Sequence, residues 1–175
     1  MSLRPHHVEL DEANDFVEQH HRHHAPARGH RFSLGVGDEA LRGVAICGRP
    51  VGRGIDPRAV LEVVRVCTDG ARNACSWLYS HAARCAADMG YQAVVTYTSV
   101  EEQGASLRAC GWWPEVLDVR GDYSFASKTR SRQAKKGKAA VQKIRWLWLT
   151  GNEAPRPAKK QRTKTKAQLD LLEAA

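Results

Sequence analysis

The chain has 175 residues, 42% of them hydrophobic, and its 27 Lys and Arg against 19 Asp and Glu give a formal net charge of +8. No apolar run approaches the ~20 residues that a membrane-spanning helix needs, and the first residues lack the apolar stretch of a signal peptide. The five cysteines form no Cys-x-x-Cys pair, which argues against a disulfide framework or a zinc ribbon. We therefore expect a cytoplasmic protein of one domain with a tail, without a metal and without a membrane segment.

The positive charge is concentrated at one end of the chain. All nine lysines lie at or after Lys128. Residues 1–127 carry 13 Arg and 16 acidic residues, a net charge of −3, whereas residues 128–175 carry 14 basic and three acidic residues, a net charge of +11. This asymmetry predicts a polyanionic partner, most often a nucleic acid. A tail that only improves solubility is the alternative.

Hydrophobic periodicity and turn residues predict an alternating series of helices and strands. In chain order, we expect a helix from Asp11 to about His20, hairpin strands over 32–36 and 41–47, a strand over 59–68, a helix over 73–89, a strand over 93–98, a short helix over 102–110 and weaker strands between 116 and 125. The strand over 59–68 is β-branched and almost wholly apolar, which is typical of a central position. The order predicts an α/β (α+β) domain with a mostly antiparallel sheet, flanking helices and one parallel strand–helix–strand crossover.

The composition divides the chain into three expected parts. Residues 1–127 form the body, and residues 128–151 form a basic extension. Within that extension, the alternating segment 141–149 is expected to pack on the body as a strand. Residues 152–175 are expected to form a basic, flexible tail.

The loop 68–72, between the central strand and the long helix, is the first candidate binding site. Backbone N–H groups at a helix N-terminus attract anions, because they have no partner within the helix and the helix dipole favours negative charge there. An ordinary strand-to-helix turn explains the same loop, and we favour it when the loop is considered alone.

Four histidines fall within five residues at 20–24. Imidazoles act as general bases and as metal ligands, but no carboxylate or cysteine partner lies at a fixed spacing nearby. We expect His21 and His24 to act in a site without a metal. An exposed polar run at a helix end is the alternative.

Three further residues are candidates for proton transfer. Tyr97 and Glu102 lie at the carboxyl end of a predicted buried strand, where open α/β sheets place ligands; a core tyrosine and a helix start explain them equally well. Glu62 interrupts the apolar central strand, where an unpaired carboxylate is costly to bury, so it is a candidate base or half of a structural ion pair. In a straight strand Arg65 points to the opposite face, which makes it an unexpected partner for Glu62.

Basic residues surround an indole in the C-terminal part of the chain. The candidates for contact with nucleic acid are Lys128, Arg130, Arg132, Lys135, Lys136, Lys143, Arg145 and Trp146. Cations neutralise phosphates and release counterions, and an indole can stack on an unpaired base. The alternative is that Trp146 packs against the body.

The order of elements over residues 8–126 resembles the GNAT N-acetyltransferase fold. The segment 68–78 stands where that family carries an Arg/Gln-x-x-Gly-x-Gly/Ala loop around the pyrophosphate of acyl-CoA, and 102–112 resembles the family's short helix ending in Gly-Phe. The resemblance implies a cofactor loop made of Asp69, Gly70, Arg72, Asn73, Ser76 and Tyr79. The two loop glycines are replaced by Asn73 and Cys75, and the tyrosine that often acts as general acid is replaced by Leu107. Acetyl-CoA is therefore one possible donor, and the donor stays open.

Five short segments together resemble the Mom-like proteins of phages and prophages, which modify adenine in DNA: 20–26, 48–51, 72–79, 96–98 and 106–109. The resemblance implies transfer of a carbamoylmethyl- or acyl-type group to N6 of adenine in the host cytoplasm, which protects phage DNA from restriction. It also implies three parts of a site. Asn73, Ser76 and Tyr79 would line a pocket at the start of the long helix, and Tyr97, Glu102, Ser106 and Arg108 would form the opposite wall. His21, His24 and Arg53 would close the cleft. The alternatives are an acyl-CoA-dependent N-acetyltransferase on a small-molecule or protein amine, and a nucleic-acid-binding module without activity.

Overall fold

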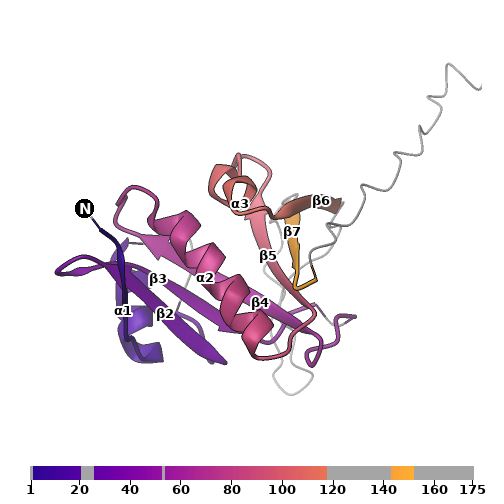
Figure 1. Cartoon of the computed structure of the whole chain (residues 1–175), viewed down its shortest axis with the longest axis horizontal. Helices are drawn as coiled ribbons and strands as arrows, with labels where there is room; N and C mark the ends of the chain where they lie inside the picture. Colours follow the sequence, from indigo (N-terminus) through magenta and orange to yellow (C-terminus); the bar gives the residue numbers. More distant parts are fainter. Residues whose placement is uncertain (1, 21–25, 53, 118–142, 152–175) are drawn as a thin grey trace, which may run out of the picture.

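The structure is a computed structural model that describes residues 2–20, 26–52, 54–117 and 143–151 (Figure 1). The elements in chain order are β1 (Arg4–His6), α1 (Leu10–His20), β2 (Phe32–Gly37), β3 (Leu41–Gly48), β4 (Val60–Thr68), α2 (Ala74–Asp88), β5 (Ala93–Ser99), α3 (Ala105–Ala109), β6 (Trp113–Leu117) and β7 (Lys143–Leu149). None of the described helices combines the length and the apolar character that crossing a membrane requires.

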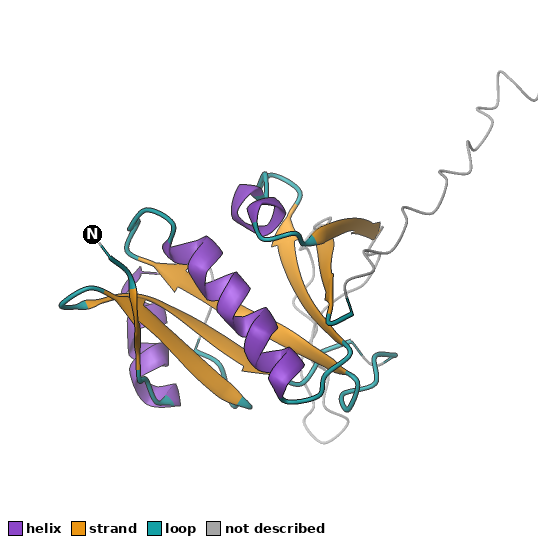
Figure 2. Cartoon of the chain, in the orientation of Figure 1, coloured by secondary structure: helices purple, strands orange, loops and turns teal. Residues whose placement is uncertain are grey.

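The strands form one sheet in the order β1-β2-β3-β4-β5-β7-β6. Neighbouring strands are antiparallel except β4 and β5, which are parallel and are joined through α2. α1 packs on one face of the sheet, and α2 and α3 pack on the other (Figure 2). The predicted mixed fold class, with its hairpin and its single parallel crossover, is confirmed.

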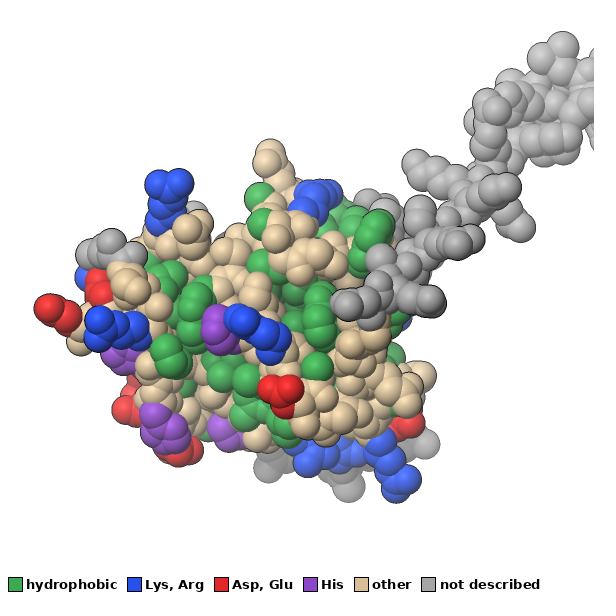
Figure 3. All heavy atoms as spheres, in the orientation of Figure 1, with side chains coloured by type: hydrophobic (Ala, Val, Ile, Leu, Met, Phe, Trp, Pro, Cys, Tyr) green, Lys and Arg blue, Asp and Glu red, His purple; other side chains and the backbone are tan. Residues whose placement is uncertain are grey.

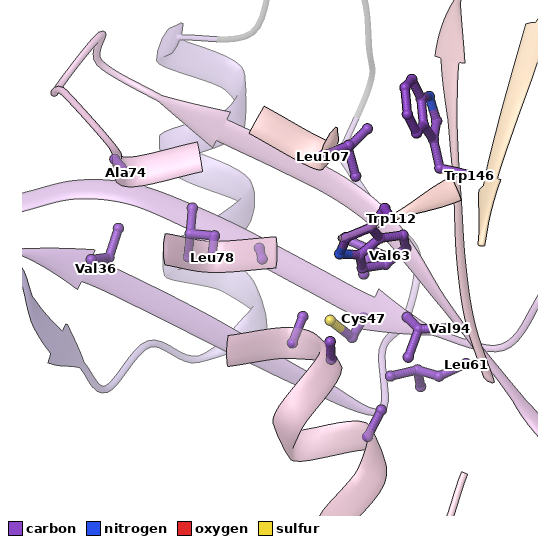
Figure 4. Packing of buried hydrophobic residues seen from close by; sticks show 14 residues of the cluster. Val36, Cys47, Leu61, Val63, Ala74, Leu78, Val94, Leu107, Trp112 and Trp146 are labelled. Carbon is purple, nitrogen blue, oxygen red and sulfur yellow. The ribbon is translucent and has the colours of Figure 1, made fainter. Parts of the chain in front are cut away.

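Alternating residues of the inner strands build the two layers of the core. Ala45 and Cys47 of β3 belong to the cluster that α2 covers, whereas Val44 and Ile46 belong to the cluster under α1. This division follows from the strand backbone, because successive side chains point to opposite faces. Figure 4 shows the larger of the two clusters, which extends along the sheet from β2 to β7.

The C-terminal strand lies inside the sheet. β7 pairs with β5 along its whole length and with β6 on its other side. The predicted body ended at residue 127, and the segment 141–149 was expected to pack on it. The sheet is incomplete without β7, so the predicted boundary is corrected. β6 also begins earlier than predicted, at Trp113, and the predicted strand residues after Leu117 lie outside the described residues.

β4 is not a straight strand. Its register with β3 shifts between Ile46 and Cys47, so that one additional β4 residue is accommodated. Leu61 and Val63, which precede the shift, and Val66, which follows it, all pack in the cluster under α2. Odd-numbered residues of β4 therefore face α2 before the shift, and even-numbered residues face it afterwards. Glu62 and Arg65 therefore share the face opposite α2. The prediction that they point to opposite faces is wrong, because it assumed a regular strand.

Candidate functional site

β4 and β5 diverge in the middle of the sheet. Their pairing ends at Glu62 and Val95, although both fully described strands continue beyond these residues. Just past that point, the Thr96 hydroxyl donates to the Val63 carbonyl oxygen at 2.9 Å. A side-chain bond thus replaces the backbone ladder at the carboxyl end of the strands, the edge where open α/β sheets bind ligands.

A pocket of about 390 Å³ lies between the loop after β4, the first turn of α2, and α3. Its lining residues are Thr68, Gly70, Ala71, Asn73, Cys75, Ser76, Ala105, Ser106 and Ala109. No side chain caps the N-terminus of α2, and unpaired N–H groups and the helix dipole favour an anionic group at such an end. The pocket is therefore suited to a ligand with a polar, negatively charged part.

Asn73 gives the loop its shape. Its φ of 65° lies in the left-handed region, and it is the only non-glycine with positive φ among the described residues. Asparagine tolerates this region better than most residues, because its short polar side chain can form local hydrogen bonds. The Asn73 carbonyl accepts hydrogen bonds from the Ser76 hydroxyl at 2.9 Å and from the Trp77 N–H at 2.9 Å. The bend places the start of α2 against the pocket.

Three of the six predicted cofactor residues line this pocket: Gly70, Asn73 and Ser76. Asp69 does not, because its carboxylate accepts the Ala71 N–H at 2.9 Å and forms an ion pair with Arg42 at 3.1 Å. This arrangement ties the loop to β3. Arg72 is exposed and lies outside the lining residues.

Tyr79 lies about one turn further along α2 than the pocket and does not line it. Its ring packs edge-on against Trp112 at 5.6 Å between ring centres. Burial raises the pKa of the Tyr79 hydroxyl, although a hydrogen bond with Thr96 acts in the opposite direction. The hydroxyl therefore stays protonated and connects α2 to the diverging strands.

α3 forms the opposite wall of the pocket. Of the two predicted substrate-binding residues on this helix, Ser106 lines the pocket and Arg108 does not. Arg108 donates to the Gln103 carbonyl, and its guanidinium lies 5.1 Å from the centre of the Trp146 ring. Arg108 therefore stabilises the turn into α3.

Trp146 is buried completely. Its indole N–H donates to the Thr98 hydroxyl at 2.9 Å, and its ring packs against Gly104 at the start of α3. The prediction that Trp146 stacks on nucleic-acid bases is corrected, because no part of its ring is accessible. The alternative, packing against the body, is what the structure shows, and this packing supports the α3 wall.

Glu62 and Tyr97 both lie on the face of the sheet opposite α2. The loop after β3 connects them: the Val51 N–H donates to Glu62 Oε2 at 2.8 Å. A Cβ built on the adjacent Gly52 would lie 3.9 Å from the Tyr97 hydroxyl. Both residues were proposed as proton-transfer groups, and the tertiary structure brings them to the same short stretch of loop.

The Glu62 side chain is almost buried, with 5% of the residue exposed. Burial raises the pKa of its carboxyl, while the Val51 N–H, Arg65 and Lys143 partly offset that rise. A carboxylate with a raised pKa is a stronger base than an exposed glutamate. Glu62 therefore has the properties of a general base.

A row of polar side chains continues across the sheet from Tyr97. Tyr97 is paired with Arg145 on β7, which is paired with Glu115 on β6. The Arg145 guanidinium donates to Glu115 Oε2 at 2.7 Å from Nε and also hydrogen-bonds Tyr97. Together these contacts raise the pKa of Arg145, against the lowering effect of burial. Arg145 thus positions the Tyr97 hydroxyl.

The remaining predicted site residues have separate outcomes. Glu102 is exposed in the turn after β5, with its backbone N–H bonded to the Ser99 carbonyl. His21, His24, Arg53, Lys128, Arg130, Arg132, Lys135 and Lys136 lie outside the described residues. Within the part of the chain that is described, no three His, Cys, Asp or Glu side chains gather as metal ligands.

Other site features were not predicted. Thr68, Cys75 and Ala109 line the pocket without having been named as individual site residues, although each lies in a segment that the sequence analysis had singled out. The Val51 N–H that binds Glu62 has no sequence signature, because every residue except proline carries the same group. On α2, the Arg84 guanidinium contacts the His81 ring at 3.0 Å. Figure 3 shows one face of the molecule, on which a histidine side chain lies next to a Lys or Arg side chain.

Comparison with known proteins supports the fold. No family model matches the sequence, and no curated protein does. Solved acetyltransferase structures resemble the chain at low identity. A Bacillus subtilis acetyltransferase in complex with CoA is 12% identical with a TM-score of 0.54, covering 84% of this chain and 97% of its own.

Two further structures are similar over comparable lengths. The ribosomal-protein-S18-alanine N-acetyltransferase of Escherichia coli is 11% identical with a TM-score of 0.58, covering 90% of this chain and 99% of its own. A Drosophila melanogaster polyamine N-acetyltransferase is 11% identical with a TM-score of 0.55, covering 85% and 100%. At these identities the similarity establishes the fold: the chain has the GNAT acetyltransferase fold.

Proposed function

We propose that this protein transfers an acyl group from acyl-CoA to an amine. The observation that carries the proposal is the position of two sites at the divergence of β4 and β5. The pocket lies on the α2–α3 side at the carboxyl end of β4, and Glu62 and Tyr97 lie on the opposite face. A donor and an acceptor that enter from opposite faces can meet between the strands.

The pocket residues fit the polar part of an acyl-CoA donor. The N-terminus of α2 supplies N–H groups for a phosphate, and the Ser76 and Ser106 side chains line the same pocket. The sequence has Asn73 where the GNAT loop has glycine, yet Asn73 adopts the left-handed conformation that glycine provides. Because the backbone bend is retained, we consider acyl-CoA the better candidate donor.

Glu62 is the proposed general base. In the reaction, the nitrogen of the acceptor forms a bond to the acyl carbon, the C–S bond of the thioester breaks, and Glu62 takes a proton from the amine. The thiolate takes a proton from solvent. The Val51 N–H holds the Glu62 carboxylate in place, and Arg145 orients Tyr97 beside it. The donor, when bound, supplies the activated acyl group.

Calorimetry with acetyl-CoA, followed by thiol release in the presence of a panel of amines, tests the proposal. We expect saturable binding and amine-dependent release. Ala105→Trp, which fills the pocket, is expected to abolish binding, whereas Val100→Trp, at a side chain that is 45% exposed, is the matched control. Absence of acetyl-CoA binding by the folded wild-type protein would refute the proposal.

A second candidate is the Mom-like modification of the adenine amine in DNA. The charge of residues 128–175 favours it, because a net charge of +11 suits a polyanion. The chain leaves the described sheet at Leu117 and re-enters it at Lys143, which is paired with Ser99 at the carboxyl end of β5. Lys143 and Arg145, which belong to this basic segment, therefore lie in the strand next to β5. Mass spectrometry of nucleosides from cells that express the protein tests this candidate, and unmodified adenine at good expression would exclude it.

A further inference from the structure

Arg42, on β3, connects the loop of the pocket to the β2–β3 hairpin. Its guanidinium donates from Nη1 to Asp69 Oδ2 at 3.1 Å and from Nε to Asp38 Oδ1 at 3.2 Å. The main chain of the same residue adds a third contact, because the Asp69 N–H donates to the Arg42 carbonyl oxygen at 3.0 Å. Both the backbone and the carboxylate of Asp69 are therefore attached to one residue, which itself lies outside the pocket lining.

The other oxygen of the Asp69 carboxylate fixes the loop. Oδ1 accepts the Ala71 N–H at 2.9 Å, across Gly70, which has a φ of +96°. The Ala71 carbonyl in turn accepts the N–H of Ala74, the first residue of α2, at 3.2 Å. Gly70 and Ala71 both line the pocket. The conformation of this wall thus depends on the Asp69 carboxylate, and the position of that carboxylate depends on Arg42.

Asp69 also brings a negative charge to a pocket that suits an anion. Its carboxylate is one hydrogen bond away from the lining residue Ala71, and like charges at such short range repel each other. Arg42 supplies the compensating positive charge by direct contact. The hydrogen bond with Asp69, followed by the bond with Asp38, raises the pKa of the Arg42 guanidinium.

The second carboxylate that Arg42 contacts is stabilised within its own turn. Asp38 Oδ1 accepts the N–H groups of Glu39 at 2.9 Å and Ala40 at 3.3 Å. These contacts, with the one from Arg42, lower the pKa of the Asp38 carboxyl. Asp38 therefore holds Arg42 from the hairpin side, while Nη1 of Arg42 faces Asp69.

We propose that Arg42 is a positioning residue for the acyl-CoA donor. It holds the loop 69–71 through Asp69, and it neutralises the Asp69 carboxylate beside the pocket, so that the phosphates of the donor meet N–H groups without a facing negative charge. This inference rests on the proposed function. It extends the donor site to a strand residue that does not line the pocket.

The first test measures the affinity for acetyl-CoA by calorimetry. Arg42→Gln is expected to weaken binding about fivefold, because the pair is partly exposed and solvent screens part of its energy. Adding Asp69→Asn to this variant is expected to restore part of the affinity, because asparagine keeps the acceptor for the Ala71 N–H and removes the charge. Arg84→Gln, at an exposed arginine of α2 outside the pocket lining, is the control and leaves binding unchanged.

The second test separates electrostatic positioning from a general loss of structure. S-acetylpantetheine carries the same thioester as acetyl-CoA but has no phosphate. Arg42→Gln is expected to lower kcat/KM for acetyl-CoA and to leave kcat/KM for S-acetylpantetheine unchanged. An equal loss with both donors, or no rescue by Asp69→Asn, would overturn the inference, because a disordered site would affect the two donors alike.

Hydrogen exchange of the Ala71 amide, measured by NMR without any ligand, distinguishes this inference from the proposed function. Arg42→Gln is expected to speed this exchange, whereas Arg84→Gln is not. If the exchange rises in this way but the wild-type protein does not bind acetyl-CoA, the acyl-CoA proposal is refuted and the positioning of the loop by Arg42 is supported. If the wild-type protein binds acetyl-CoA, and Arg42→Gln changes neither the affinity nor the exchange, the role of Arg42 is refuted and the proposed function stands.

Discussion

Gly104 packs directly against the indole ring of Trp146, at the point where α3 begins. A Cβ on Gly104 would overlap the ring, and the φ of Gly104 is +61°. The contact joins α3, which forms one wall of the pocket, to a strand 42 positions later in the chain. It explains why β7 is part of the site as well as part of the sheet.

Gly104→Ala is therefore expected to destabilise the fold. The left-handed backbone costs about 1 kcal/mol or more for alanine, and overlap with a packed ring adds about 1–3 kcal/mol. Urea denaturation measures the loss. Gly29→Ala is the control, because nothing lies within 4 Å of a Cβ there, and its expected effect is within about 0.5 kcal/mol. Equal stabilities of the two variants would contradict the packing described.

Glu62→Gln tests the buried carboxylate through stability. Because the folded-state pKa of Glu62 is raised, the wild-type protein loses stability as the pH rises through that pKa, while the glutamine variant does not. The variant is expected to match the wild type near pH 4 and to gain relative stability towards pH 7. Urea denaturation at several pH values follows this difference. A difference that does not change with pH would contradict the raised pKa.

The same substitution tests the proposed base through activity. A base acts only when it is deprotonated, so wild-type kcat/KM is expected to fall as the pH drops through a value above the ordinary glutamate pKa of about 4.3. Glu62→Gln is expected to lose about 10²–10⁴-fold in rate. Glu39→Gln, in the exposed turn between β2 and β3, is the matched control. An active Glu62→Gln variant would remove Glu62 from the mechanism.

Cys75 reports on occupancy of the pocket. It lines the pocket and is partly exposed, whereas Cys47 is fully buried and burial raises the pKa of its thiol. Saturating CoA is expected to slow alkylation of Cys75 by iodoacetamide, which peptide mass spectrometry measures. Cys85, near the other end of α2, is partly exposed and lies outside the pocket lining, so its alkylation is the internal control. Protection of Cys85 together with Cys75 would indicate a general effect on α2.

Asn73 tests the conformation of the loop. Asn73→Gly is expected to keep the stability within about 0.5 kcal/mol, because glycine adopts a φ of 65° readily. Asn73→Val is expected to lose about 1–3 kcal/mol, because a branched side chain is strained there. Calorimetry is expected to show that acetyl-CoA binds Asn73→Gly at least as tightly as the wild type. Weaker binding would mean that the Asn73 side chain itself contacts the donor.

Removal of residues 152–175 tests the basic tail. The cut leaves every described helix and strand in the chain, so the thermal unfolding temperature is expected to change little. Affinity for DNA and the slope of its salt dependence are expected to fall, because fewer phosphates are neutralised. Unchanged affinity and slope would show that the tail takes no part in binding DNA.

Local patterns in the sequence were sufficient for much of the fold. Alternation predicted the β2–β3 hairpin, the β-branched run predicted β4 as an inner strand, and the apolar stripe of α2 predicted the parallel crossover. These features depend on residues that are near one another in the chain, so the periodicity of hydrophobic residues predicts them. The loop before α2 was a candidate site for the same reason, because a strand end and a helix start are both local.

Long-range contacts determined the rest. The position of β7 between β5 and β6, the burial of Trp146 and the shared face of Glu62 and Arg65 depend on pairing and on a bulge that no short segment reveals. Glu62 and Tyr97 were each suspected from their own strands. Their meeting at the Val51–Gly52 loop required the whole sheet, because strand register and loop closure, which bring distant residues together, are collective properties of the folded chain.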